Sequence, residues 1–237
     1  MTLTAQTRQP VIGGLIPFSS VDYPGQLACV VFLAGCPWRC SYCHNPHLLS
    51  RKPHAGAPAW SDTLAWLQTR RHLLDAAVFS GGEPLSEPLL PRMLADVKAL
   101  GMKTALHTGG AWPERLARCL PLLDWVGFDI KAPFADYAQI TTRLKSGAQA
   151  RTSLQHLLAS GVAYECRTTL HPALLDTAQL RRLAATLAVQ GVQHYVLQPY
   201  RAAGCDQALP IAQGWPDAAL LSEMGALFAH FSVRGIT

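Results

Sequence analysis

Three cysteines lie within eight residues of the stretch Cys36-Pro37-Trp38-Arg39-Cys40-Ser41-Tyr42-Cys43-His44-Asn45-Pro46. The stretch directly follows the apolar run of residues 27–33, which predicts a strand buried on both faces of a parallel sheet. Three soft ligands on one loop indicate a metal centre, because thiolates favour zinc, copper(I) and iron–sulfur clusters. The sequence therefore predicts a metal site at the end of a buried strand.

The spacing of the three cysteines bears on which metal they hold. A closed zinc site needs a fourth ligand, and His44 is a poor one because neighbouring residues such as Cys43 and His44 rarely point at one ion without strain. An aromatic residue, Tyr42, precedes the third cysteine. This arrangement fits a [4Fe-4S] cube held by three thiolates, with one iron left open for another ligand. A zinc-binding interaction module remains an alternative.

Composition limits the other possibilities. The 237 residues suit a single α/β barrel, and the net charge of +5 comes from 20 scattered Lys and Arg residues. No basic stripe with interleaved aromatics indicates nucleic-acid binding, although a weakly basic face could meet an acidic protein partner. The longest apolar stretch, residues 27–35, is far shorter than the ~20 residues that span a bilayer.

The cysteines also indicate a cellular compartment. No secretory signal is recognisable, and seven cysteines in such a chain predict a reducing cytoplasm, where thiols stay free or bind metal. Cys29, Cys119, Cys166 and Cys205 are single, and we expect small buried side chains. Cys205 stands out because it follows Gly204 in a predicted loop.

After residue 60 the chain alternates between predicted helices and strands, and this pattern is typical of a parallel sheet. Gly101, Gly161 and Gly191 each follow a predicted helix, where a left-handed C-cap residue belongs. Six strands alternating with helices predict a parallel sheet. A Rossmann-like open sheet is the less favoured form of it, because no G-x-G-x-x-G follows a strand. The expected strands are 27–33, 76–80, 103–107, 125–129, 164–170 and 194–198, and the expected helices are 61–71, 88–100, 113–120, 153–160, 177–189 and 216–230.

The predicted domain organisation is one domain over residues 1–237. It comprises an N-terminal strand and turn (1–26), a barrel core (27–200) and a C-terminal extension with a helix (201–237). Polar groups follow every predicted core strand, at the face where such folds place their reactive residues. Besides the cysteine loop, these groups are Gly81-Gly82-Glu83-Pro84, His107-Thr108-Gly109-Gly110, Asp129-Ile130-Lys131, Arg167-Thr168-Thr169 and Gln198-Pro199-Tyr200-Arg201.

With these motifs the sequence resembles the radical S-adenosylmethionine superfamily, whose CxxxCx(aromatic)C signature matches Cys36, Cys40, Tyr42 and Cys43. The resemblance implies an α/β fold, the partial (β/α)6 barrel of this superfamily, with a [4Fe-4S] cluster and S-adenosylmethionine as cofactors. It further implies cofactor-binding roles for Gly81, Gly82 and Glu83 (amino group), Asp129 and Lys131 (ribose and carboxylate region), Arg167 (carboxylate), Tyr42 (adenine) and His44.

The sequence is most similar to one class of that superfamily, the activating enzymes of glycyl-radical enzymes. Val21-Asp22-Tyr23-Pro24-Gly25 and Thr108-Gly109-Gly110 resemble that class, particularly the activating proteins of anaerobic ribonucleoside-triphosphate reductase, with pyruvate formate-lyase activating enzyme as a near relative. The chain departs from that relative at two positions. At His107 the relative has an Asp that helps build a monovalent-cation site, and at Arg201 the relative has a His.

The resemblance implies an activase that reductively cleaves S-adenosylmethionine to a 5′-deoxyadenosyl radical, which removes a hydrogen from a glycine of a partner enzyme. Asp22 is then expected to meet the incoming glycyl loop, although a carboxylate in a Pro-Gly turn is by itself usually turn chemistry. A low-potential donor such as flavodoxin or ferredoxin is expected to supply the electron. A radical enzyme acting on a small molecule remains an alternative.

Overall fold

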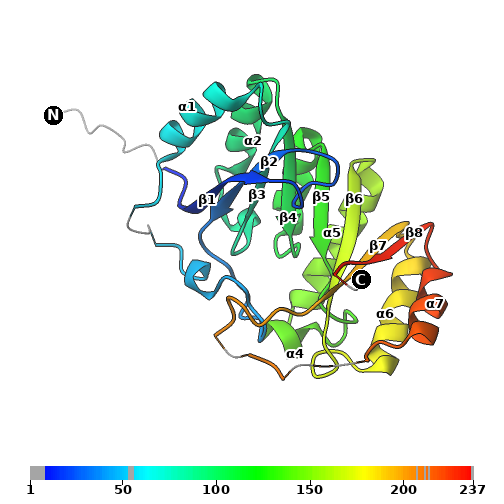
Figure 1. The fold of residues 1–237 in the computed structure, drawn as a ribbon. Coiled ribbons are helices and arrows are strands. Elements are labelled where there is room, and N and C mark those ends of the chain that lie inside the picture. Colours follow the sequence, from blue (N-terminus) through cyan, green and yellow to red (C-terminus); the bar gives the residue numbers. More distant parts are fainter. Residues whose placement is uncertain (1–8, 53–55, 207, 211, 213, 236–237) are drawn as a thin grey trace.

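A computed structural model describes residues 9–52, 56–206, 208–210, 212 and 214–235. Within them a single sheet runs in chain order from β1 to β8, with helices packed around it (Figure 1). The strands are β1 (Ile12–Ser19), β2 (Ala28–Leu33), β3 (Ala76–Gly81), β4 (Lys103–Thr108), β5 (Trp125–Asp129), β6 (Ala163–Leu170), β7 (His194–Pro199) and β8 (His230–Val233). The helices are α1 (Trp60–Arg70), α2 (Leu90–Ala99), α3 (Pro113–Cys119), α4 (Tyr137–Thr141), α5 (Ser146–Ser160), α6 (Thr177–Val189) and α7 (Ala218–Gly225), with short 3-10 turns at Pro46–Leu48, Pro84–Ser86 and Leu120–Leu122.

The sheet is a partial barrel. β1 pairs antiparallel with β2, and each later pair of neighbours is parallel. β1 and β8 are the two edges, so the sheet does not close on itself. The expected α/β fold with six parallel strands is therefore confirmed in β2–β7, and β1 and β8 extend it on either side.

The two faces of the sheet carry different side chains because successive residues of a strand point to opposite sides. Cys29, Val31 and Phe79 belong to the large core beneath the helices. Small residues such as Ala28 and Ala105 belong to a second cluster, in which Tyr23 stacks on Trp125 with 5.3 Å between ring centroids. The inner face is thus lined by small residues and closed at one end by aromatic rings, and polar side chains occupy the other end.

Two details confirm the predicted helix ends and most of the predicted burial of single cysteines. Gly101, Gly161 and Gly191 have φ of +77°, +72° and +89°, the left-handed conformation that a residue after a helix needs. Cys29, Cys119 and Cys166 are buried free cysteines as expected, whereas Cys205 is only partly buried. No helix in the described part of the chain is long and apolar enough to cross a membrane.

Several predicted boundaries were wrong. Ser61 is not an N-cap, since α1 begins at Trp60 after Ala59. α5 begins at Ser146, seven residues before the expected start, and the short α4 was missed. The predicted helix 216–230 is only Ala218–Gly225, and the chain then enters β8, which places Arg234 within 2.7 Å of Glu165. A four-residue edge strand offers too short a pattern to recognise from sequence.

Candidate active site

The cysteine loop leaves the end of β2 and is held on both sides by backbone hydrogen bonds. Its first residues are fixed to the turn that follows the loop, where the Cys36 amide donates to the Leu49 carbonyl at 3.1 Å. Its middle is fixed to α4, where the amides of Arg39 and Ser41 donate to Thr141 and Ile140. These bonds position the loop without using a side-chain sulfur, so all three thiols remain available as ligands.

The three cysteines of the loop are partly buried. Burial raises the pKa of Cys36 to about 12 and also raises the pKa of Cys40, although the Lys131 ammonium opposes the shift at Cys40. A bound metal reverses this preference because it replaces the proton on sulfur. Among the described residues no three His, Cys, Asp or Glu side chains converge as ligands of one ion. An iron–sulfur cube does not require such convergence, because each thiolate binds a different iron.

The Gly81-Gly82-Glu83 segment packs directly against β2 and the cysteine loop. A Cβ at Gly81, whose φ is +130°, would lie 2.1 Å from the Leu33 oxygen, and a Cβ at Gly82 would lie 2.8 Å from the Gly35 oxygen. Only glycine permits this approach. The Gly-Gly pair therefore brings the β3 loop and the cysteine loop together, in addition to leaving space for a ligand.

Glu83 is 3% exposed, and its carboxylate links two strand ends. Its Oε1 accepts hydrogen bonds from Leu85 N (3.1 Å) and Thr108 Oγ1 (2.6 Å), and its Oε2 accepts one from Gly109 N (3.0 Å). Burial raises the pKa of Glu83 against the effect of these donors. Much of its hydrogen-bonding capacity therefore holds the β4 loop beside the β3 loop.

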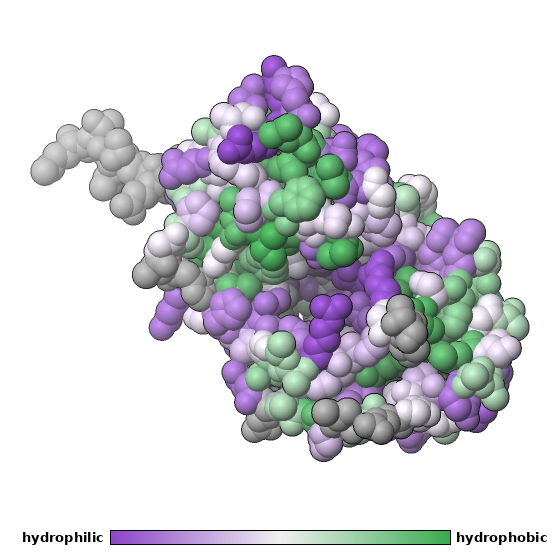
Figure 2. All heavy atoms as spheres, in the orientation of Figure 1, coloured by the Kyte–Doolittle hydropathy of each residue, from purple (hydrophilic) through white to green (hydrophobic). Residues whose placement is uncertain are grey.

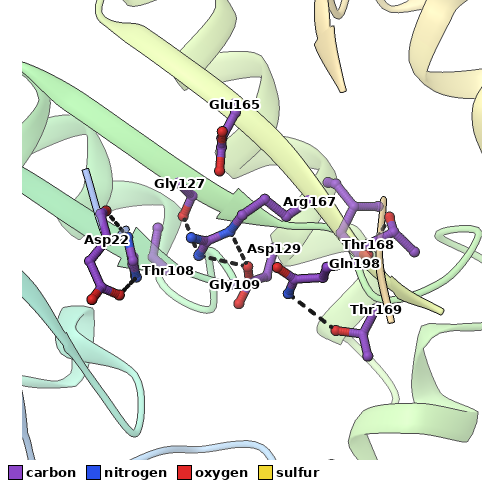
Figure 3. Close-up of polar contacts among 12 residues, drawn as sticks. Asp22, Thr108, Gly109, Gly127, Asp129, Glu165, Arg167, Thr168, Thr169 and Gln198 are labelled. Carbon is purple, nitrogen blue, oxygen red and sulfur yellow. Dashed lines mark hydrogen bonds and ion pairs between the residues drawn. The ribbon is translucent and has the colours of Figure 1, made fainter. Parts of the chain in front are cut away.

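Charged side chains from β5 and β6 form the opposite wall (Figure 3). Arg167 Nη2 and Nε lie 2.8 and 2.9 Å from Asp129 Oδ1, and Lys131 Nζ lies 3.9 Å from Asp129 Oδ2. Burial opposes ionisation of Asp129, but the charges of Arg167 and Lys131 lower its pKa below the usual value. Arg167 therefore reaches the site already paired with a carboxylate.

Gly127 makes that pair possible, and sequence reasoning missed it. A Cβ on Gly127 would lie 2.7 Å from Nη1 of Arg167. The carbonyl of Gly127 also accepts a hydrogen bond from Arg167 Nη2 at 3.4 Å. The signal in the sequence was its position two residues before Asp129, which places both on one face of the strand.

Tyr42 and His44 contact residues that follow β5 and β7. Lys131 Nζ lies 5.7 Å from the centre of the buried Tyr42 ring. His44 Nε2 is 3.0 Å from the carbonyl oxygen of Arg201. Arg201 therefore makes this contact with the cysteine loop through its backbone and not through its side chain. Cys205 Sγ lies 3.6 Å from the Tyr42 carbonyl oxygen. The segment after β7 therefore covers one side of the cysteine loop.

Asp22 lies in the turn between β1 and β2. Its Oδ2 accepts a hydrogen bond from the Ser19 hydroxyl, and its backbone carbonyl lies 2.7 Å from His107 Nε2. Burial, helped by the Arg167 charge, lowers the pKa of His107 to about 3, so the imidazole is neutral and Nε2–H donates. The 3.8 Å approach of His107 Nδ1 to the Asp22 carboxylate is therefore not an ion pair at neutral pH.

One cavity collects these groups. In the space-filling view a hollow surrounded by hydrophilic side chains opens between the two halves of the molecule (Figure 2). Asp22 is not part of the cavity lining and reaches it only through His107. The other predicted site residues all line it: Cys36, Cys40, Tyr42, Cys43, His44, Gly81, Gly82, Glu83, Asp129, Lys131 and Arg167.

The donor set fits an iron–sulfur cluster with a bound amino acid derivative. Cys36, Cys40 and Cys43 supply soft ligands at one wall of the cavity. Gly81 and Gly82 line another wall, and the charged side chains of Asp129, Lys131 and Arg167 supply hard, polar contacts. These are complementary to the ammonium, carboxylate and hydroxyl groups of S-adenosylmethionine.

Comparison with known proteins supports this assignment at the level of the family. Residues 30–188 match the model of the radical SAM superfamily. The chain is 32% identical over 195 residues to the pyruvate formate-lyase-activating enzyme of Clostridium pasteurianum, covering 79% of this chain and 80% of the relative. It is 27% identical over 198 residues to a protein of Methanocaldococcus jannaschii named as a glycyl-radical enzyme activating enzyme, covering 80% of both chains.

Solved structures support the fold. QueE from Escherichia coli aligns with a TM-score of 0.57 at 22% identity, over 82% of this chain and 86% of QueE. SuiB from Streptococcus suis bound to S-adenosylmethionine aligns with a TM-score of 0.64 at 12% identity, over 84% of this chain. The chain spans about half the length of SuiB, with 48% of SuiB covered.

Members of this superfamily use a [4Fe-4S] cluster and S-adenosylmethionine, and the donor set of the cavity fits both. The chain belongs to the radical SAM superfamily and, within it, to the family of glycyl-radical enzyme activating enzymes.

Proposed function

We propose that this protein generates a glycyl radical on a partner enzyme, which we propose to be anaerobic ribonucleoside-triphosphate reductase. The observation that carries the proposal is the single cavity that contains three thiols, the Gly-Gly segment and the charges of β5 and β6. When bound, the cluster would supply one electron and S-adenosylmethionine would accept it, which would provide a carbon radical able to take hydrogen from a substrate.

The residues of this chain bind the cluster and S-adenosylmethionine, orient the bound cofactor, and exclude water from the cavity. Cys36, Cys40 and Cys43 hold the cluster. Backbone oxygens of the Gly81–Gly82 segment receive the amino group of the cofactor, and Glu83 fixes the two loops around it. Asp129, Lys131 and Arg167 orient its ribose and carboxylate, and Tyr42 with His44 contacts the adenine. No acid–base pair is required, because the hydrogen leaves the glycine carbon as an atom with one electron and not as a proton.

Asp22 is proposed to meet the glycine-containing loop of the partner. The turn that carries it is tied to the cavity through the His107 contact, and its carboxylate is 30% exposed. An exposed acceptor at this place could hold backbone amides of a peptide and set the position of its glycine. Positioning of this kind matters because a misplacement of about 1 Å can reduce a rate ~100-fold.

The relative from Clostridium pasteurianum supports a second candidate, a pyruvate formate-lyase type of partner. The two candidates share the same chemistry and differ in the protein that enters the site. We propose anaerobic ribonucleoside-triphosphate reductase on the motif resemblance around residues 21–25 and 108–110.

The test is an anaerobic activation assay with both partners in parallel. Cluster-loaded protein, reductant and S-adenosylmethionine are incubated with each partner, and the glycyl radical is measured as a doublet by electron paramagnetic resonance. A doublet on the reductase alone supports the first proposal, and a doublet on the lyase alone supports the second. Absence of a radical on both, despite cleavage of S-adenosylmethionine, would contradict the proposed activity and favour a small-molecule substrate.

A further inference from the structure

A basic surface lies beside the cysteine loop. We call it the basic face and define it by Arg39, Arg143, Leu144 and Lys145, all of which are exposed. The two segments that carry it are joined, since the Arg39 amide donates to the Thr141 carbonyl at 3.0 Å. Arg143 Nε also donates to the carbonyl of Pro37 at 2.9 Å. These contacts hold the segment after α4 beside the cysteine loop; the position of α4 in the fold is shown in Figure 1.

The positive charge of this face is not balanced locally. Residues 36–52 and 137–151 contain no Asp or Glu. Among the described residues, Arg39, Arg143 and Lys145 take part in none of the ion pairs. Leu144 projects from the same face with 96% of its surface exposed. An exposed apolar side chain between unpaired cations is typical of a surface that meets an acidic protein.

The basic face is close to the cysteine cavity. A surface groove is lined by Pro37, Trp38, residues 142–145 and Gln149. Trp38 lines this groove and also lines the cavity that contains Cys36 and Cys40. The Trp38 ring is 2% exposed and would lie 2.5 Å from a Cβ at Gly109, so it reaches across the interior. One indole therefore separates an external groove from the site of the cluster.

We propose that the basic face is the docking surface for an acidic one-electron carrier protein. This inference rests on the proposed function, which requires a reduced cluster. In the step, the carrier loses one electron and the cluster gains it, and no covalent bond forms or breaks. Opposite charges would speed the encounter, and docking at the groove would bring the carrier within one side chain of the cavity.

The test compares two charge-reversed variants by stopped-flow under anaerobic conditions. R143E/K145E alters the basic face, and the control R70E/R71E makes the same change in net charge beside α1, at the opposite end of the molecule (Figure 1). Cluster-loaded protein without S-adenosylmethionine or partner enzyme is mixed with a reduced flavodoxin of net negative charge. Loss of the visible absorbance of the cluster then gives the reduction rate.

We expect R143E/K145E to be reduced by flavodoxin on the order of tenfold more slowly at low salt, with the gap narrowing as salt is added. The control should keep the wild-type rate. Photoreduced 5-deazariboflavin, a small uncharged reductant, should reduce all three proteins equally. K145E alone, which leaves the Arg143 contact with Pro37 in place, should show a smaller slowing in the same direction.

A wild-type rate for R143E/K145E, or an equal loss in the control, would overturn the proposal. Normal reduction by flavodoxin combined with loss of glycyl-radical formation would also overturn it, and would assign the face to the substrate enzyme. Failure of the proposed function has a separate outcome, because the wild-type protein would then be reduced by flavodoxin faster than R143E/K145E while no partner enzyme gained a radical.

Discussion

Replacement of Gly127 by alanine tests whether the charged wall of the cavity depends on the space at this position. The new methyl carbon would lie 2.7 Å from Nη1 and 2.8 Å from Cζ of Arg167. The guanidinium has little freedom to move away, because its side chain is 8% exposed and is bonded to Asp129 Oδ1. We therefore expect Gly127→Ala to break or lengthen the Arg167–Asp129 contact.

The size of the effect follows from the interaction that is lost. One hydrogen bond to a charged group contributes about 1.5–3 kcal/mol, and overpacking typically costs about 1–3 kcal/mol. Since 1.4 kcal/mol corresponds to a factor of ten, the affinity for S-adenosylmethionine should fall by roughly tenfold or more. The thiols are on a different wall, so iron content should remain unchanged.

The assay is an anaerobic calorimetric titration of cluster-loaded protein with S-adenosylmethionine. Gly14→Ala is the matched control, because a Cβ at Gly14 has no atom within 4 Å, and it should bind like the wild type. Wild-type affinity in Gly127→Ala would refute the reasoning. It would mean that the Arg167–Asp129 pair does not organise the binding site.

Three further predictions concern single side chains. Lys131→Ala should weaken S-adenosylmethionine binding by about 1.5–3 kcal/mol with the cluster retained; unchanged affinity in the same titration would exclude a contact with the cofactor. Asp22→Ala should keep the cluster and uncoupled cleavage of S-adenosylmethionine but lose most glycyl-radical formation, and a wild-type radical yield would make Asp22 a turn residue only. His107→Gln should reduce the loss of stability on acidification. The folded pKa of His107, about 3, is below its unfolded value of 6.5, so stability is lost as pH falls from 6.5, by up to about 1.4 kcal/mol per pH unit. Urea unfolding of cluster-free protein at pH 6.5 and 5 should show a smaller difference for His107→Gln than for the wild type, and equal differences would contradict burial of a neutral imidazole. His194, whose pKa burial also lowers, is present in both proteins and cancels.

The parallel strands and the residues at their ends were predictable because both depend on local pattern. Buried strands such as β5 and β7 are short apolar runs between helices. Their carboxyl ends lie at one edge of the sheet, so residues such as Lys131 and Cys40 come together whatever the packing in between. Gly101 and Gly161 marked helix ends through a backbone conformation that other residues adopt only with strain.

What could not be predicted depends on contacts between distant segments. The bond between His107 and the Asp22 carbonyl joins residues 85 positions apart, and no periodicity encodes it. In the sequence Gly127 is an ordinary strand residue. Its role becomes visible only from the close approach of the Arg167 side chain in the structure. β8 was missed, and only its first residue fell in the predicted helix 216–230, because these four residues form a strand by pairing with β7. Tertiary pairing here overrides the local preference.

Hydrogen transfer from the partner's glycine tests the central claim most directly. The partner enzyme is prepared with glycine that carries deuterium at the α-carbon, and it is activated anaerobically by the cluster-loaded protein with reductant and S-adenosylmethionine. The account predicts that deuterium appears in the 5′-deoxyadenosine product, in step with the glycyl radical, and that Cys40→Ala yields neither. Unlabelled 5′-deoxyadenosine formed while the partner gains its radical would contradict direct hydrogen abstraction at this site.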